Sequence, residues 1–238
     1  MRVRLHRRGW YLIFLFAGAS AFAVSTRVEQ VHLQYRRNGA GAWSAFIRNN
    51  HRTAATAYIA QATFRQNGKQ KPTAFGGDSL GFAGGYGELP PGEETDTGHG
   101  LPGDAVVLTQ GFIAVIYADG SSEGDEDVVA MLLSGRHRAY VDLGDCLPKL
   151  EQAATGKLDM QALNAFFESM KTGDQAEGAK LDELIDVPGV KHRYFMSAVP
   201  TQALSLLENG NTPDQAALVL AECKGWRKRL AESKPDIK

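Results

Sequence analysis

Oxygen-bearing side chains occupy alternate positions in the segment 119–127, and this spacing could form a calcium site. The ligands would be Asp119, Ser121, Glu123, Asp125 and Asp127. Ca²⁺ needs several oxygen ligands at close range, and calcium loops carry glycine at their sixth position, which is Gly124 here. The twelfth position is Ala130 where such a loop has a bidentate glutamate. We therefore expect a turn followed by a helix start, with the acids at the positive end of the helix dipole, and calcium is the alternative.

The same segment has the spacing of a nucleophile elbow. Gly120 and Gly124 flank Ser122, which would be the nucleophile of a serine hydrolase. His192 follows in the chain as a candidate base, after three acids that could orient it: Asp142, Asp159 and Asp182. No run of parallel strands is predicted after Ser122, and the acids around this serine would oppose a developing oxyanion. We expect no catalytic residues, and the hydrolase is the rival hypothesis.

A second acidic segment could bind zinc. Its titratable residues are Glu88, Glu93, Glu94, Asp96, His99 and Asp104. Asp96 and His99 are three residues apart, a spacing that zinc sites use, but a catalytic zinc needs three ligands on rigid elements. We expect a solvated acidic loop here, and likewise a solvated face at Arg136-His137-Arg138.

The first 23 residues have the three parts of a secretory signal. Four arginines precede an apolar run from Trp10 to Phe22, and Ala21-Phe22-Ala23 is a small-x-small cleavage pattern. The apolar run of about thirteen residues is short for a membrane-spanning helix. We expect an exported protein, periplasmic or extracellular, that has no membrane span after cleavage. The alternative is an uncleaved N-terminal anchor.

Export changes the charge of the chain. Removing the four arginines leaves 22 of the 26 basic side chains against all 27 acidic ones, so the formal charge becomes −5. An acidic protein is a poor non-specific ligand for phosphate backbones, so we expect no nucleic-acid partner.

Two cysteines, Cys146 and Cys223, remain after cleavage. In an oxidising compartment a pair of cysteines is commonly bridged, so we expect a Cys146–Cys223 disulfide. The alternative is two buried thiols that pack as small hydrophobes.

Period-two alternation predicts strands in the residues from 24 to 124. Apolar and polar residues alternate around Val31–Arg36, Trp43–Ile47 and Tyr58–Arg65, and Phe112–Ala118 is apolar on both faces, as in a central strand. Half of the residues between Gly76 and Gly87 are glycine, and we expect no regular structure there.

Residues 125–238 have helical periodicity. One stripe predicts a long helix from about Asp125, disturbed near Pro148: Val129, Leu132, Arg136, Tyr140, Leu143, Leu147 and Leu150. A second helix is predicted to end at Gly173. Thr212-Pro213-Asp214-Gln215 predicts a third helix start, with Thr212 as N-cap and Gln215 completing a capping box.

Three local features together resemble a known type of protein. They are an Asn-containing strand connection at Asn49-Asn50, the turn Pro90-Pro91-Gly92-Glu93 and a strand that ends in Ala118-Asp119-Gly120. Over about residues 28–125 the chain resembles uncharacterised secreted bacterial proteins with an immunoglobulin- or fibronectin-type-III-like β-sandwich. The resemblance implies an interaction scaffold.

We therefore expect an α+β protein: a signal peptide (1–23), an antiparallel β-sandwich (24–124) and a helical region (125–238). Its expected role is non-catalytic binding or structure in the cell envelope, with an unknown protein or envelope component as partner. Phe75, Phe82 and Tyr86 are the expected contact surface, because binding residues tend to lie on loops held by a rigid scaffold. Alternatively these aromatics fold back over the sandwich core.

Overall fold

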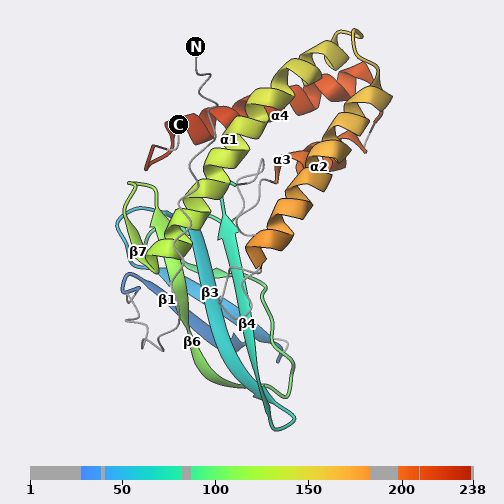
Figure 1. Ribbon diagram of the computed structural model, residues 1–238. Coiled ribbons are helices and arrows are strands. Elements are labelled where there is room, and N and C mark those ends of the chain that lie inside the picture. The colour runs from blue at the N-terminus through green and yellow to red at the C-terminus, as the bar shows by residue number, and fades with distance from the viewer. Residues whose placement is uncertain (1–27, 39–40, 82–86, 183–197, 209, 237–238) are drawn as a thin grey trace, which may run out of the picture.

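A computed structural model shows strands in the N-terminal part of the chain and helices in the C-terminal part (Figure 1). It describes residues 28–38, 41–81, 87–182, 198–208 and 210–236. Residues 174–182 are described by their backbone alone. The expected order of strands followed by helices is confirmed. The expected signal segment 1–23 lies outside the described residues.

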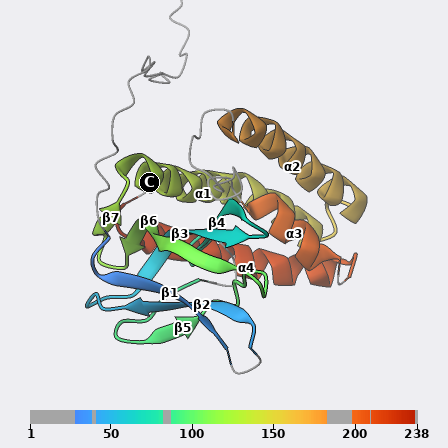
Figure 2. The ribbon, with the colours of Figure 1, turned by 90° about the horizontal axis from the view of Figure 1, so that it is seen from below.

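The described strands form two antiparallel sheets. The first has the order β1-β2-β5 and comprises β1 (Val31–Arg37), β2 (Trp43–Asn49) and β5 (Glu94–Asp96). The second has the order β4-β3-β6-β7 and comprises β3 (Ala55–Gln66), β4 (Lys69–Asp78), β6 (Val106–Tyr117) and β7 (Ser122–Gly124). Figure 2 shows the first sheet as one layer and the second sheet between it and the first helix.

The alternation of side chains along β3 explains how its sheet packs on both faces. Tyr58, Ala60 and Ala62 point into a core shared by the two sheets. Ala57 and Ile59 point to the opposite face, where they pack against the first turns of the helix α1. Successive residues of a strand face opposite sides, so a strand buried on both sides is apolar throughout.

Four helices are described: α1 (Glu126–Ala154), α2 (Met160–Asp182), α3 (Val199–Leu207) and α4 (Pro213–Glu232). Their common core includes the fully buried side chains Leu143, Leu150, Leu163, Phe167 and Trp226. The helix α1 contains Pro148 in its interior and does not end there. The helix α2 continues past Gly173, so the predicted end at Gly173 is wrong.

The start of α4 is where local prediction was most accurate. Thr212 is the N-cap, and its hydroxyl accepts a hydrogen bond of 3.3 Å from the backbone N–H of Gln215. The side chain of Gln215 does not complete the capping box. It donates instead to the carbonyl of Leu206 at 2.7 Å, which ties the end of α3 to the start of α4.

The glycine-rich segment contains more regular structure than expected, because β4 extends through Gly76 and Gly77. A Cβ on Gly77 would lie 3.0 Å from the Cα of Gly87, whose φ is +92°. The two glycines therefore allow two backbones to approach each other, where side chains would keep them apart.

The prediction of a Cys146–Cys223 disulfide is wrong for this structure, because each cysteine is a buried thiol. Both belong to the helical core, in which Cys146 Sγ lies 3.6 Å from Met170 Sδ. Burial, followed by the negative charge of Glu222, raises the pKa of the Cys223 thiol to about 12. The cysteines thus pack as small hydrophobes, as in the alternative interpretation.

Candidate functional site

The segment 119–127, the candidate calcium loop, forms the turn between β6 and β7 and the start of α1. The carboxylate of Asp119 accepts hydrogen bonds from the hydroxyl and the backbone N–H of Ser121, at 2.6 and 3.1 Å. Its other oxygen accepts a bond of 3.0 Å from Arg52, whose side chain is 82% exposed. The Ser121 bonds first, and then Arg52, hold the pKa of Asp119 well below its usual range. Asp119 is therefore an ionised carboxylate that stabilises the turn.

The other acids of this segment face different partners. Glu123 accepts hydrogen bonds from the backbone N–H groups of Glu29 and Gln30, at 2.6 and 3.1 Å, and so holds the start of the described chain. Asp125 is the N-cap of α1 and accepts bonds from two N–H groups of its first turn. The predicted turn and helix start are confirmed. Among the described residues, no group of three or more His, Cys, Asp or Glu side chains is placed to hold a metal ion.

An imidazole and a phenol stack beside this turn. The rings of His51 and Tyr117 lie 3.8 Å apart at an interplanar angle of 21°, and His51 Nδ1 is 3.0 Å from the hydroxyl of Thr53. Tyr117 is buried, and burial is the main cause that raises its pKa, with Glu123 adding to the effect. The Tyr117 phenol therefore stays protonated at neutral pH and cannot serve as a base.

Ser122, the candidate nucleophile, is exposed on the short edge strand β7, where it pairs with Ile116 of β6. Within the described part of the chain, no hydrogen bond joins its hydroxyl to a histidine. His192, the candidate base of the rival hydrolase hypothesis, lies outside the described residues. The second sheet that carries Ser122 is antiparallel, which differs from the parallel sheet on which a nucleophile elbow is normally found.

The second acidic segment is more ordered than a solvated loop. Glu94 forms an ion pair with Arg36, and Asp96 accepts hydrogen bonds from the hydroxyl of Ser44 and the backbone N–H of Gly98. The Ser44 bond is the main cause that lowers the pKa of Asp96. These contacts place β5 beside β2, so the expectation of a loop is wrong for these residues.

The zinc interpretation fails because Asp96 and His99 face different groups. The ring of His99 stacks on Phe75 with centroids 4.2 Å apart and an interplanar angle of 14°, and its Nε2 is 3.3 Å from the hydroxyl of Thr73. Asp104, another acid of this segment, accepts a hydrogen bond of 2.9 Å from the side-chain amide of Gln66, so it too has a partner other than a metal ion.

Phe75 is part of the core between the two sheets and not an exposed contact residue. It is 8% exposed, and its ring makes edge contacts with Tyr35 and Tyr58, with centroids 6.4 and 6.3 Å away. The expectation of exposure is therefore wrong for Phe75, because this part of the glycine-rich segment is strand β4. Phe82 and Tyr86 lie outside the described residues.

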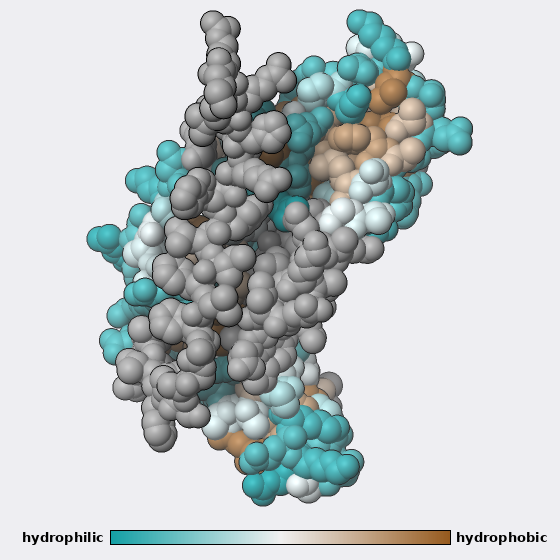
Figure 3. Space-filling model, in the orientation of Figure 1, coloured by the Kyte–Doolittle hydropathy of each residue, from teal (hydrophilic) through white to brown (hydrophobic). Residues whose placement is uncertain are grey.

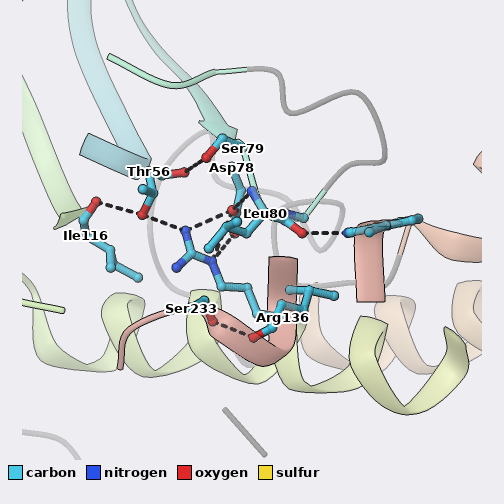
Figure 4. A network of polar contacts seen from close by, with 10 residues as sticks. Thr56, Asp78, Ser79, Leu80, Ile116, Arg136 and Ser233 are labelled. Atoms are coloured by element: carbon cyan, nitrogen blue, oxygen red, sulfur yellow. Dashed lines mark hydrogen bonds and ion pairs between the residues drawn. The ribbon is translucent and has the colours of Figure 1, made fainter. Parts of the chain in front are cut away.

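Arg136, expected on a solvated face, is buried between α1 and the second sheet (Figure 4). Its guanidinium donates to both carboxylate oxygens of Asp78 at 2.9 Å and to the hydroxyl of Thr56 at 3.0 Å. Sequence reasoning missed this network, although Arg136 lies on the apolar stripe of α1. An arginine at a core position of a helix stripe needs a buried partner, and that was the available signal.

A hollow of about 530 Å³ lies between α2 and α3. Seven polar side chains line it, together with two leucines: Asn164, Glu168, Lys171, Thr201, Leu204, Ser205, Leu207, Glu208 and Asn211. Asn164 Nδ2 donates to Asn211 Oδ1 at 3.2 Å, and Lys171 Nζ is 3.7 Å from Glu168. This concave polar surface was not predicted, because its lining comes from residues that are polar and unremarkable in sequence.

Figure 3 shows how hydropathy is distributed over one face of the molecule. Hydrophobic residues gather over the helical part, and the end formed by the β3–β4 hairpin is hydrophilic. Exposed Lys69, Gln70 and Lys71 account for the hydrophilic hairpin end. Within the described ranges, no helix combines the length and the apolar character needed to cross a membrane.

Comparison of the chain with protein-family models, with curated proteins and with solved structures gave no match.

Proposed function

We propose that this chain is an exported, non-catalytic binding protein of the cell envelope, and that the hollow between α2 and α3 is its ligand surface. The two sheets, which we interpret as a β-sandwich of the immunoglobulin- or fibronectin-type-III-like kind, act as the scaffold. The observation that carries the proposal is the hollow, with a volume of about 530 Å³. Ligand sites in proteins are concave and typically have volumes of about 300–1,000 Å³, but most of them are lined by more apolar side chains than this hollow is.

The lining favours a hydrophilic ligand that both donates and accepts hydrogen bonds. Lys171 supplies a cationic donor, Glu168 and Glu208 supply carboxylate acceptors, and the Ser205 hydroxyl can do either. Leu204 adds an apolar patch against which a ligand can pack. Soluble sugars, short peptides and cell-wall glycopeptide fragments have this mixed character.

Two hydrogen bonds support the idea that the hollow is preformed. The bond between Asn164 and Asn211 joins α2 to the segment before α4, and the bond from Gln215 to the Leu206 carbonyl fixes the end of α3. A ligand surface whose walls are already held in place needs little ordering on binding, which favours affinity.

The experiment is a titration of the ¹⁵N-labelled protein with soluble cell-wall glycopeptide fragments, simple sugars and short peptides, followed by amide chemical shifts. We expect the affected amides to cluster around Thr201, Ser205 and Asn211. Shifts that cluster on the sheets, or no shifts with any of these compounds, would contradict the proposal.

Export and the absence of hydrolysis each have a direct test. The N-terminal residue of the protein recovered from the periplasm or medium should be Val24, and a product that keeps residues 1–23 would indicate an anchor. A fluorophosphonate should not label Ser122. Labelling of the wild type that disappears in Ser122→Ala would establish the rival hydrolase.

A further inference from the structure

The helix α1 takes part in two separate hydrophobic cores. Near its start, Val128 and Leu132 pack with residues of the second sheet. From Ala139 onward, its buried residues belong to the core of the four helices. Arg136 lies between these two groups, on the same face of the helix, and its side chain is 0% exposed. The one buried charge of the described helices is therefore located where the two cores meet.

Arg136 connects α1 to two strands of the second sheet. Its Nε and Nη2 each lie 2.9 Å from an oxygen of Asp78, at the end of β4. Its Nη2 also donates to the hydroxyl of Thr56 in β3 at 3.0 Å, and that hydroxyl lies 3.3 Å from the carbonyl of Ile116 in β6. Figure 4 shows Asp78 and Thr56 around the guanidinium, with the Ile116 carbonyl beside the Thr56 hydroxyl.

The same carboxylate also reaches α4. Asp78 Oδ1 accepts hydrogen bonds from the N–H groups of Leu80 and Gly81, at 2.9 and 3.0 Å, and so fixes the turn after β4. The carbonyl of Leu80 in this turn accepts a bond of 2.7 Å from the indole Nε1 of Trp226 in α4. Asp78, at the end of β4, is therefore connected through the turn at Leu80 to Trp226 in the helical core.

A buried ion pair is a costly way to gain stability, because both groups lose their hydration, and hydrophobic side chains of similar size often serve as well. What the pair does provide is geometry, since a guanidinium and a carboxylate form their two parallel bonds in few relative positions. We propose that the Asp78–Arg136–Thr56 network is a latch that couples the sheets to the helices, so that both parts of the molecule unfold as one unit.

The test is pulsed hydrogen exchange with mass spectrometry on the full chain over a urea series. Peptides from β3 and β6 report the sheets, and peptides from α4 report the helical core. In the wild type we expect the same unfolding midpoint for both sets. In Asp78→Asn, which leaves Arg136 without its charge partner, we expect the two midpoints to separate by about 1 M urea.

Asp119→Asn is the matched control, because it makes the same substitution in the exposed pair with Arg52. Its two midpoints should stay together. The proposal is overturned if the wild-type midpoints already differ, if both midpoints of Asp78→Asn fall together, or if Asp119→Asn separates them as well.

Thr56→Val covers the case in which Asp78→Asn does not fold. This substitution removes one hydrogen bond to Arg136 and keeps the ion pair and the shape of the side chain. We expect a smaller separation of the midpoints in the same sense. Coincident midpoints in Thr56→Val, when Asp78→Asn cannot be measured, would overturn the proposal.

Discussion

Replacing Gly124 with alanine should be among the most damaging single changes in the chain. Gly124 ends β7 directly before the N-cap of α1, and its φ is +104°. A Cβ built on it would lie 2.2 Å from the carbonyl oxygen of Ile113 and 2.7 Å from the Cα of Ala114. Both atoms belong to the backbone of β6, so no side-chain rotation can relieve the overlap.

The expected loss of stability has three parts. A non-glycine residue at positive φ costs about 1–2 kcal/mol. Moving packed backbone to make room for the methyl group costs about 1–3 kcal/mol. The shift also strains the hydrogen bond of 2.7 Å from the Asp125 N–H to the Ile113 carbonyl, which is worth about 1 kcal/mol. We therefore expect Gly124→Ala to lower the free energy of unfolding by about 3–6 kcal/mol.

Urea denaturation followed by circular dichroism measures this loss, and Gly156→Ala is the control. Gly156, just after α1, also has a positive φ of +71°, but a Cβ there would meet no atom within 4 Å. Only the conformational cost of about 1–2 kcal/mol should appear. The reasoning is refuted if the two variants lose the same amount of stability.

Three further results follow from the same contacts. Arg136→Ala should lower the urea midpoint of the less stable part of the molecule by an amount equivalent to about 3–5 kcal/mol, because it leaves the Asp78 carboxylate without its buried partner and separates the transitions of the sheets and the helices. Arg52→Ala, at an exposed pair, should have little effect in the same urea assay. Iodoacetamide should label both cysteines of the unreduced protein in denaturant and neither cysteine without it, because both thiols are buried. An intact mass that rises by two hydrogens on reduction would show a disulfide and contradict this prediction. The lowered pKa of Asp119 contributes stability that is present above its unfolded pKa, near 4, and is lost as pH falls towards its folded pKa. The acid limb of the stability–pH curve should therefore be shallower in Asp119→Asn than in the wild type, and parallel curves would contradict this.

Local patterns predicted the parts of the fold that depend on local physics. The alternation in β1 and β2 follows from burial of one sheet face, and the Thr212 cap follows from the unpaired N–H groups at a helix start. The strand β4 was less accessible to prediction, because the backbone of Gly87 approaches Gly77 closely, and a strand pattern in the sequence does not show such a contact.

The network around Arg136 could be predicted only in part. Spacing placed Arg136 on the buried stripe of α1, but its partner Asp78 is 58 residues away in sequence. The three consecutive polar residues Arg136-His137-Arg138 indicated a solvated face. In the structure only His137 is exposed, Arg138 is partly buried and Arg136 is buried. Tertiary contacts decide which residue of such a group turns inward.

In the candidate sites, too, features set by neighbouring residues could be predicted and features set by tertiary contacts could not. The acids of the segment 119–127 were correctly interpreted as a turn and a helix cap, because an acid before a helix serves the N-terminal N–H groups. The hollow between α2 and α3 left no pattern in the sequence, since two helices separated along the chain supply its walls.

The most direct test of the proposal that the hollow between α2 and α3 binds a ligand is a measurement of affinity in variants that fill it. Ser205 is an exposed serine that lines the hollow on α3, and Ser134 is an exposed serine on α1 outside it. For whichever titrated compound binds the wild type, calorimetry should show binding lost in Ser205→Phe, which fills the hollow, and unchanged in Ser134→Phe. Equal affinity of the wild type and Ser205→Phe would contradict the account.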